Sequence, residues 1–140
     1  MTTFYNHREM RCVLRALALA ALLAVASCSH PRDSVPIVAE ITAITAPDTV
    51  HADETFAVVY HAILGGHSAY VLDHVDTLRT NTNLAVRIWS RDASHGGCVL
   101  WILREDDFAF AVCASGPGQF GIVGCQPDGR DTLKTITVLP

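Results

Sequence analysis

Histidine and aspartate side chains are the groups of this chain best suited to chemistry, because imidazole and carboxylate are common metal ligands. Five histidines and three nearby aspartates lie between positions 51 and 95: His51, His61, His67, His74, His95, Asp53, Asp73 and Asp76. The sequence contains neither an HExxH motif nor a CxxC pair, so this spacing does not indicate a metal. We therefore predict capping or solvated roles, no metal site and no cofactor. His74, with Asp73 and Asp76, is the first group to examine for bound metal.

Nucleophilic catalysis is not indicated either. Ser115-Gly116 and Ser94-His95 lack the Gly-x-Ser-x-Gly elbow, which also needs a strand-to-helix turn. The acidic run Glu105-Asp106-Asp107 lies between two apolar segments and is typical of a solvated turn, and it lacks the spacing of an EF-hand. Paired catalytic carboxylates would need a cleft and a raised pKa, which a sequence cannot show. We predict no catalytic residues and no enzymatic activity.

The elements that must position these residues have the period of β-strands. Short segments with two-residue alternation are separated by turn residues. They are 37–45, 55–63, 69–75, 84–89, 98–103, 108–114, 119–125 and 132–139. In the second segment Phe56, Val58 and Tyr60 share one face. Gly65-Gly66 is expected to supply the positive φ of a tight turn, and the unbroken apolar run 98–103 predicts a strand covered on both faces.

Segments 108–114 and 119–125 flank the connection Gly116-Pro117-Gly118, a pattern that predicts a β-hairpin. Pairing in the simplest register gives the hairpin one apolar face. That face consists of Phe108, Phe110, Val112, Phe120 and Ile122. Because such a face must be covered, the hairpin predicts a second sheet.

About eight short strands and no helix predict an all-β domain built as a two-sheet antiparallel sandwich, with a small barrel as the alternative. The run 46–56 resembles the start of many bacterial immunoglobulin-like domains. In these a Pro-x-x-Val edge strand, here Pro47 to Val50, and a polar turn lead into an apolar core strand. The resemblance implies an immunoglobulin-like sandwich of about seven to eight strands over residues 37–140, and it implies no functional residue.

The N-terminus has the pattern of an export signal. Residues 1–15 carry Arg8, Arg11 and Arg15 against the single acid Glu9, and residues 16–26 contain no polar side chain. This apolar run has about half of the roughly 20 residues that a membrane-spanning helix needs. We expect residues 1–27 to be a signal peptide that is cleaved.

The end of the apolar run, Val25-Ala26-Ser27-Cys28, resembles the lipobox of bacterial lipoproteins, in which an aliphatic and two small residues precede a cysteine. The resemblance implies that the Cys28 thiol carries a diacylglyceryl group and that Cys28 becomes the first, acylated residue. Two or three acyl chains, at about 0.8 kcal/mol per buried CH2, give stable anchoring. Ser29 replaces the Asp that retains some lipoproteins in the inner membrane, which favours the outer membrane if the host has one. An ordinary signal peptide, or a disulfide at Cys28, is the alternative.

Residues 28–36 form the lipidated cysteine and a polar tether with two prolines, Pro31 and Pro36. An oxidising compartment makes disulfides available to the remaining Cys98, Cys113 and Cys125, in three arrangements. The hairpin register offsets Cys113 from Cys125 by four residues, so we predict a Cys98–Cys113 bond, contributing about 3 kcal/mol. The alternative is three buried or unpaired thiols.

The charge of the mature chain excludes some partners. Removal of residues 1–27 takes three of the 10 basic and one of the 14 acidic residues, leaving 7 and 13, a balance of −6. An acidic chain without a basic stripe is not expected to bind nucleic acid or to dock electrostatically on anionic lipid. Membrane attachment would depend on the lipid.

Two hypotheses about function follow. The first is a membrane-anchored bacterial lipoprotein whose non-catalytic domain binds an envelope protein or polymer, through exposed Trp89, Tyr70 or a sheet edge. The alternative is a small metal-binding or enzymatic envelope lipoprotein that uses the His and Asp residues. We favour the first.

Overall fold

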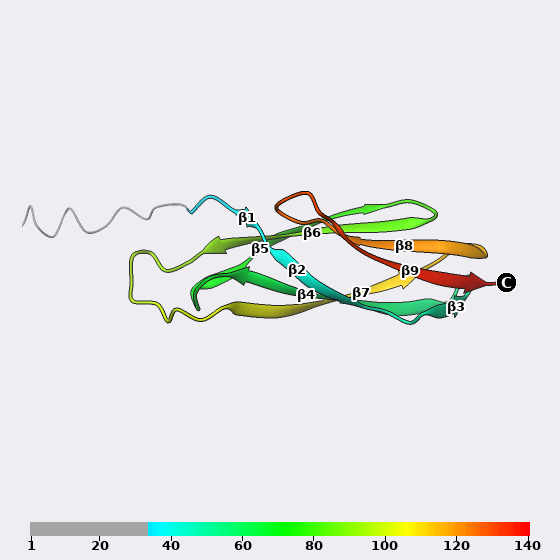
Figure 1. Cartoon of the computed structure of the whole chain (residues 1–140), viewed down its shortest axis with the longest axis horizontal. Helices are drawn as coiled ribbons and strands as arrows, with labels where there is room; N and C mark the ends of the chain where they lie inside the picture. Colours follow the sequence, from blue (N-terminus) through cyan, green and yellow to red (C-terminus); the bar gives the residue numbers. More distant parts are fainter. Residues whose placement is uncertain (1–33) are drawn as a thin grey trace, which may run out of the picture. The chain divides into compact units, whose positions relative to one another are not determined.

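The computed structural model describes residues 34–140, which form nine strands and no helix (Figure 1). The strands are β1 (Ile37–Val38), β2 (Glu40–Thr45), β3 (Thr49–His51), β4 (Thr55–Gly65), β5 (Tyr70–Arg79), β6 (Asn83–Asp92), β7 (Arg104–Cys113), β8 (Gly118–Gly124) and β9 (Thr132–Leu139). The all-β prediction is confirmed for this part of the chain. It contains no helix long and apolar enough to span a bilayer. The predicted signal peptide and Cys28 lie outside the described residues.

The strands form two sheets packed face to face, as the sandwich prediction requires (Figure 1). One sheet has six strands in the order β1-β6-β8-β9-β3, with β5 also paired to β6, and the other has three in the order β2-β4-β7. The antiparallel prediction is wrong for two pairs, β3 with β9 and β6 with β8, which are parallel. The chain leaves β6, crosses to the other sheet as β7 and returns, so β8 runs in the direction of β6.

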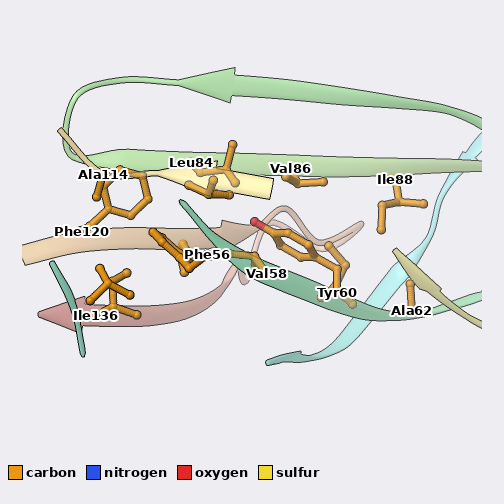
Figure 2. Packing of buried hydrophobic residues seen from close by; sticks show 14 of the residues in the cluster. Phe56, Val58, Tyr60, Ala62, Leu84, Val86, Ile88, Ala114, Phe120 and Ile136 are labelled. Atoms are coloured by element: carbon orange, nitrogen blue, oxygen red, sulfur yellow. The ribbon is translucent and has the colours of Figure 1, made fainter. Parts of the chain in front are cut away.

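The core lies between the sheets, and most of its buried side chains come from one face of β4, β6, β8 and β9 (Figure 2). In β4 the side chains of Phe56, Val58, Tyr60, Ala62 and Leu64 are buried, as the two-residue period predicts. They pack against Leu84, Val86 and Ile88 of β6 and against Phe120 and Ile136 (Figure 2). The rings of Phe56 and Phe120 meet edge to face with centroids 6.4 Å apart. Each large apolar side chain buried in this way stabilises the fold by about 1.5–3 kcal/mol.

The predicted hairpin of segments 108–114 and 119–125 is wrong. β7 pairs with β4 in the three-stranded sheet, whereas β8 pairs with β6 and β9 in the other sheet. The glycine-rich connection between them therefore crosses from one sheet to the other, and Gly116 and Gly118 both adopt positive φ there. The five apolar residues assigned to one hairpin face still contact one core, because they meet it from opposite sheets.

Two predicted strands differ in the structure. Segment 37–45 is divided at Ala39, because β1 pairs with β6 and β2 pairs with β4. Segment 98–103 is not a strand but part of the connection between β6 and β7, and its side chains other than Val99 are exposed rather than covered. We call residues 93–103 the β6–β7 loop.

The Gly65-Gly66 pair has a different role from the one predicted, because neither residue has a positive φ. At Gly65 a Cβ atom would lie 2.3 Å from ring atoms of Tyr70, so the absent side chain makes room for the ring. At Gly66 a Cβ atom would meet nothing within 4 Å. The first glycine therefore serves packing between the end of β4 and the start of β5.

Candidate functional site

The outer surface of β5 and β6 carries a group of charged and aromatic side chains that we call the β5–β6 cluster. It consists of Asp73, His74, Asp76, Arg87, Trp89 and Arg91. The pairing of β5 with β6 sets His74 opposite Trp89 and Asp76 opposite Arg87, while a register shift between Leu72 and His74 adds Asp73. Such a shift re-aims side chains at the edge of a sheet.

The members of the β5–β6 cluster are joined to one another. The ring of His74 stacks on Trp89 at 5.4 Å between centroids, and Arg87 lies 6.0 Å from the centre of the same indole. The Trp89 indole N–H donates to Asp76 at 2.8 Å. Arg91 Nε lies 3.2 Å from an Asp73 oxygen. Opposite charges thus neutralise each other on a surface that presents aromatic and guanidinium groups, the side chains enriched at binding interfaces.

The first candidate metal ligands all belong to this cluster. These residues, His74, Asp73 and Asp76, do not surround a common point. Asp73 Oδ2 lies 2.6 Å from His74 Nδ1, whereas Asp76 Oδ1 lies 4.0 Å from Nε2 at the other edge of the ring. Over residues 34–140, no group of three or more His, Cys, Asp or Glu side chains is arranged to hold a metal ion.

Three further histidines lie outside the β5–β6 cluster. The His51 ring contacts the carbonyl of Pro140, and the His67 ring lies against Tyr70 at 4.5 Å with its Nε2 3.5 Å from Asp92. His95 sits in the exposed β6–β7 loop with a positive φ of 47°. The hydrogen bond from the Ser94 N–H and the nearby rings of His67 and His95 lower the pKa of Asp92, so these two histidines lie near the same carboxylate.

A row of three polar side chains that the sequence analysis missed crosses the outer face of the three-stranded sheet. His61 Nε2 lies 2.9 Å from the Thr45 hydroxyl, and His61 Nδ1 lies 2.7 Å from Asp107 Oδ1. The three residues come from three different strands, β2, β4 and β7. Asp107 is directly opposite His61 in the β4–β7 register. The order hydroxyl, imidazole, carboxylate is that of a nucleophile with its general base and orienting acid.

The surroundings of this row differ from those of a hydrolytic site. The side chains of His61 and Asp107 are 37% and 68% exposed, on a sheet face whose neighbouring β4 and β7 positions are Val59 and Ala109. Catalysis at such a row gains most from a dry site with oxyanion donors. A cross-strand hydrogen-bonded ladder is the simpler role, because opposed polar pairs stabilise sheets. The predicted turn at residues 105–107 is wrong, because these residues lie within β7, near its start.

A shallow cleft of about 450 Å³ lies at the 125–131 turn, lined by Glu40, Gln126, Pro127, Asp128 and Arg130. The amide of Gln126 is already engaged there: it accepts from the N–H of Ile41 at 3.1 Å and donates to the carbonyl of the same residue at 2.5 Å. Gln126 thus attaches the turn to β2.

The cysteines of the described residues, Cys98, Cys113 and Cys125, are free thiols. Cys98 lies in the β6–β7 loop, before the first residue of β7, and this loop is hydrogen-bonded to Ser68. Cys113 is the last residue of β7, at the other end of that ten-residue strand. Ten strand residues span roughly 33 Å, and a disulfide needs Cα atoms within about 7 Å. The predicted Cys98–Cys113 bond is therefore not formed in this structure. The predicted hairpin register, on which the exclusion of a Cys113–Cys125 bond depended, is also absent, because β8 pairs with β9.

The chain was also compared with known proteins. No family model, no curated protein and no solved structure matches it.

Proposed function

We propose that this chain is a lipid-anchored lipoprotein of the bacterial cell envelope whose β-sandwich is a non-catalytic binding or accessory module. The observation that carries the proposal is the order of segments along the chain. A basic and then apolar N-terminus ends in Val25-Ala26-Ser27-Cys28, and Ser34, six positions after the cysteine, already contacts the domain at the carbonyl of Asp92. Six residues are a short tether to a membrane. Ser29 favours the outer membrane where the host has one.

The attachment is tested on the native protein. We expect mass spectrometry of protein extracted from membranes with detergent to find a mature N-terminus at Cys28 that carries acyl groups. The variant Cys28→Ser is expected to yield no acylated N-terminal peptide, and Cys98→Ser, the matched control, is expected to keep it. A bare Cys28 or an uncut N-terminus in the native protein would contradict the proposal.

The binding role is supported by β5 and by the cluster beside it. Among residues 34–140, β5 is paired only to β6, and most of its residues are exposed. Within this part of the chain it therefore contributes little to the core but presents a free edge ten residues long. A free edge can add an extended peptide, and neighbouring side chains then supply selectivity. The β5–β6 cluster, with Trp89 at its centre, lies next to this edge.

A photoreactive side chain at position 89 tests this surface in cells. We expect one discrete cross-linked product when the probe replaces Trp89, and none when it replaces Leu133, an apolar residue that is 64% exposed on β9. Equal products at both positions, or none at position 89, would remove the β5–β6 cluster as the contact.

The row of Thr45, His61 and Asp107 favours a second candidate function, a small hydrolytic lipoprotein. This candidate predicts hydrolysis of an activated ester such as p-nitrophenyl acetate that is lost on His61→Ala and retained on His51→Ala. The metal-binding form of the same alternative predicts stoichiometric metal in untagged protein that is lost on His74→Ala. Absence of both effects leaves the binding module.

A further inference from the structure

The β6–β7 loop exposes a continuous run of large apolar side chains. Leu100, Trp101, Ile102 and Leu103 are 67%, 82%, 59% and 59% exposed. The loop contains no Asp, Glu, Lys or Arg between Asp92 and Arg104. Single exposed apolar residues are ordinary on a protein surface, but a contiguous group of four, including a tryptophan, marks a surface that meets an apolar partner.

The loop is held in place by the neighbouring β4–β5 connection. The Ser68 N–H donates to the carbonyl of Leu100 at 2.9 Å, and the Ser68 hydroxyl accepts from the Leu100 N–H at 3.2 Å. The rings of His67 and Trp101 meet edge to face at 5.7 Å. An Ile102 N–H to Leu100 carbonyl bond of 2.9 Å closes a tight turn at the tip. The apolar side chains are therefore presented by an anchored backbone.

The tether enters the domain at the same end as this loop. The Ser34 hydroxyl donates to the carbonyl of Asp92 at 2.5 Å, and Asp92 is the last residue of β6, directly before the loop. Figure 1 shows the loop beyond the strand ends on the side where the coloured ribbon begins, with the C-terminus at the opposite end. Six residues reach at most about 20 Å, at about 3.3–3.6 Å per residue. A lipid on Cys28 would hold this end of the sandwich within that distance of the bilayer.

We propose that the β6–β7 loop inserts into the interfacial region of the bilayer that holds the Cys28 lipid. This inference rests on the proposed lipoprotein function. Trp101 suits the interface, since indole combines an apolar body with a polar N–H, and the leucine and isoleucine side chains reach into the acyl boundary. Because the loop has no Asp, Glu, Lys or Arg, insertion does not require the desolvation of such a charged side chain.

Insertion at this end sets the orientation of the domain relative to the membrane. The long strands then run away from the membrane, and the end that carries Pro140 and the β3–β9 pair faces the aqueous envelope space (Figure 1). The β5–β6 cluster lies along the side of the sandwich, where a partner can reach it. The lipid supplies attachment, and the loop supplies orientation.

The test uses full-length mature protein, extracted from membranes and reconstituted into phosphatidylethanolamine and phosphatidylglycerol vesicles with or without brominated phosphatidylcholine. The chain has two tryptophans, so Trp89→Phe leaves Trp101 as the only one. We expect Trp101 emission to be blue-shifted and to fall at least twofold with brominated lipid. In the matched control, Trp101→Phe, Trp89 emission is expected to be unchanged. The emission of wild-type protein is measured beside both variants. If Trp89→Phe folds poorly, the difference between wild type and Trp101→Phe still reports the quenching of Trp101.

A second variant tests the contribution of the neighbouring side chains. Leu100→Asp with Ile102→Asp, in the Trp89→Phe background, is expected to lose most of the quenching while the protein still floats with the vesicles. Both residues are exposed, so the fold does not depend on them.

Three results would overturn the inference. Protein that floats with the vesicles but whose Trp101 emission is unquenched overturns insertion alone and leaves the lipoprotein proposal standing. A blue shift without bromine quenching means that protein, either a second copy or a partner, covers the loop. Protein that does not float, and whose N-terminal peptide carries no acyl mass, overturns the proposed function and this inference with it.

Discussion

Ser90 shows how one polar side chain in the core joins the two sheets. It is fully buried in β6, and its hydroxyl donates to the carbonyl of Leu64 in β4, in the opposite sheet, at 2.5 Å. We expect Ser90→Ala to lower the free energy of unfolding by about 1–3 kcal/mol, because it leaves a buried carbonyl unsatisfied. Urea unfolding measures the change. Ser115→Ala, at an exposed serine, is the control and is expected to stay within about 0.5 kcal/mol.

The pair of Asp48 and Lys134 makes stability depend on pH. Lys134 Nζ donates to Asp48 Oδ1 at 2.7 Å, and this hydrogen bond, with the charge of the ammonium group, lowers the pKa of Asp48 from 3.8. A lowered carboxyl pKa stabilises the folded state above the unfolded pKa, and that stability is lost as pH falls through the folded value. Lys134→Met should therefore be slightly less stable than wild type near neutral pH.

The difference between the two proteins is expected to shrink as the pH falls below about 4, where Asp48 becomes protonated in the unfolded state and then in the folded state. Urea unfolding at a series of pH values measures it. The effect is small, because the carboxylate is exposed to solvent. A difference that persists at full size to about pH 2 would assign the role of Lys134 to packing instead.

At the scale of elements, the two adjacent glycines after β4 give a matched pair of variants. Gly65→Ala places a Cβ atom 2.3 Å from the Tyr70 ring, so the ring must move away from the start of β5. We expect a loss of about 1–3 kcal/mol in the free energy of unfolding. Gly66→Ala meets nothing within 4 Å and is expected to be neutral within about 0.5 kcal/mol. Equal effects would mean that backbone freedom, not ring packing, sets the cost.

The elements themselves show which sequence patterns are informative. The alternation of Phe56, Val58 and Tyr60 predicted β4 and its buried face, because a half-buried strand must obey the two-residue period. The unbroken apolar run at 98–103 predicts a strand covered on both faces, but it lies in an exposed loop. A continuous apolar run predicts side chains that are shielded from water. It does not distinguish between shielding by the chain's own core and shielding by another apolar partner.

At the scale of the whole molecule, the positions of the thiols predict how the protein responds to reduction. Cys98 and Cys113 lie toward opposite ends of β7, and all three described cysteines are free. We therefore expect dithiothreitol to leave the unfolding free energy of the mature protein unchanged. A Cys98–Cys113 bond would instead contribute about 3 kcal/mol, lost on reduction. Urea unfolding with and without reductant, beside Cys98→Ser as a control, distinguishes the two.

The sequence by itself determined what depends on neighbouring residues: the strand period, the all-β class, the need for two sheets, and the signal and lipobox pattern before Ser34. Only the tertiary structure decided which strands pair. A strand pattern fixes the face that is buried, but it does not fix the partner at the strand edge, so β7 and β8 could face each other across the core instead of forming a hairpin. The β5–β6 cluster, the row through His61, and the placement of the β6–β7 loop beside Ser34 follow from that pairing. These contacts join residues far apart in the chain, and no local spacing encodes them.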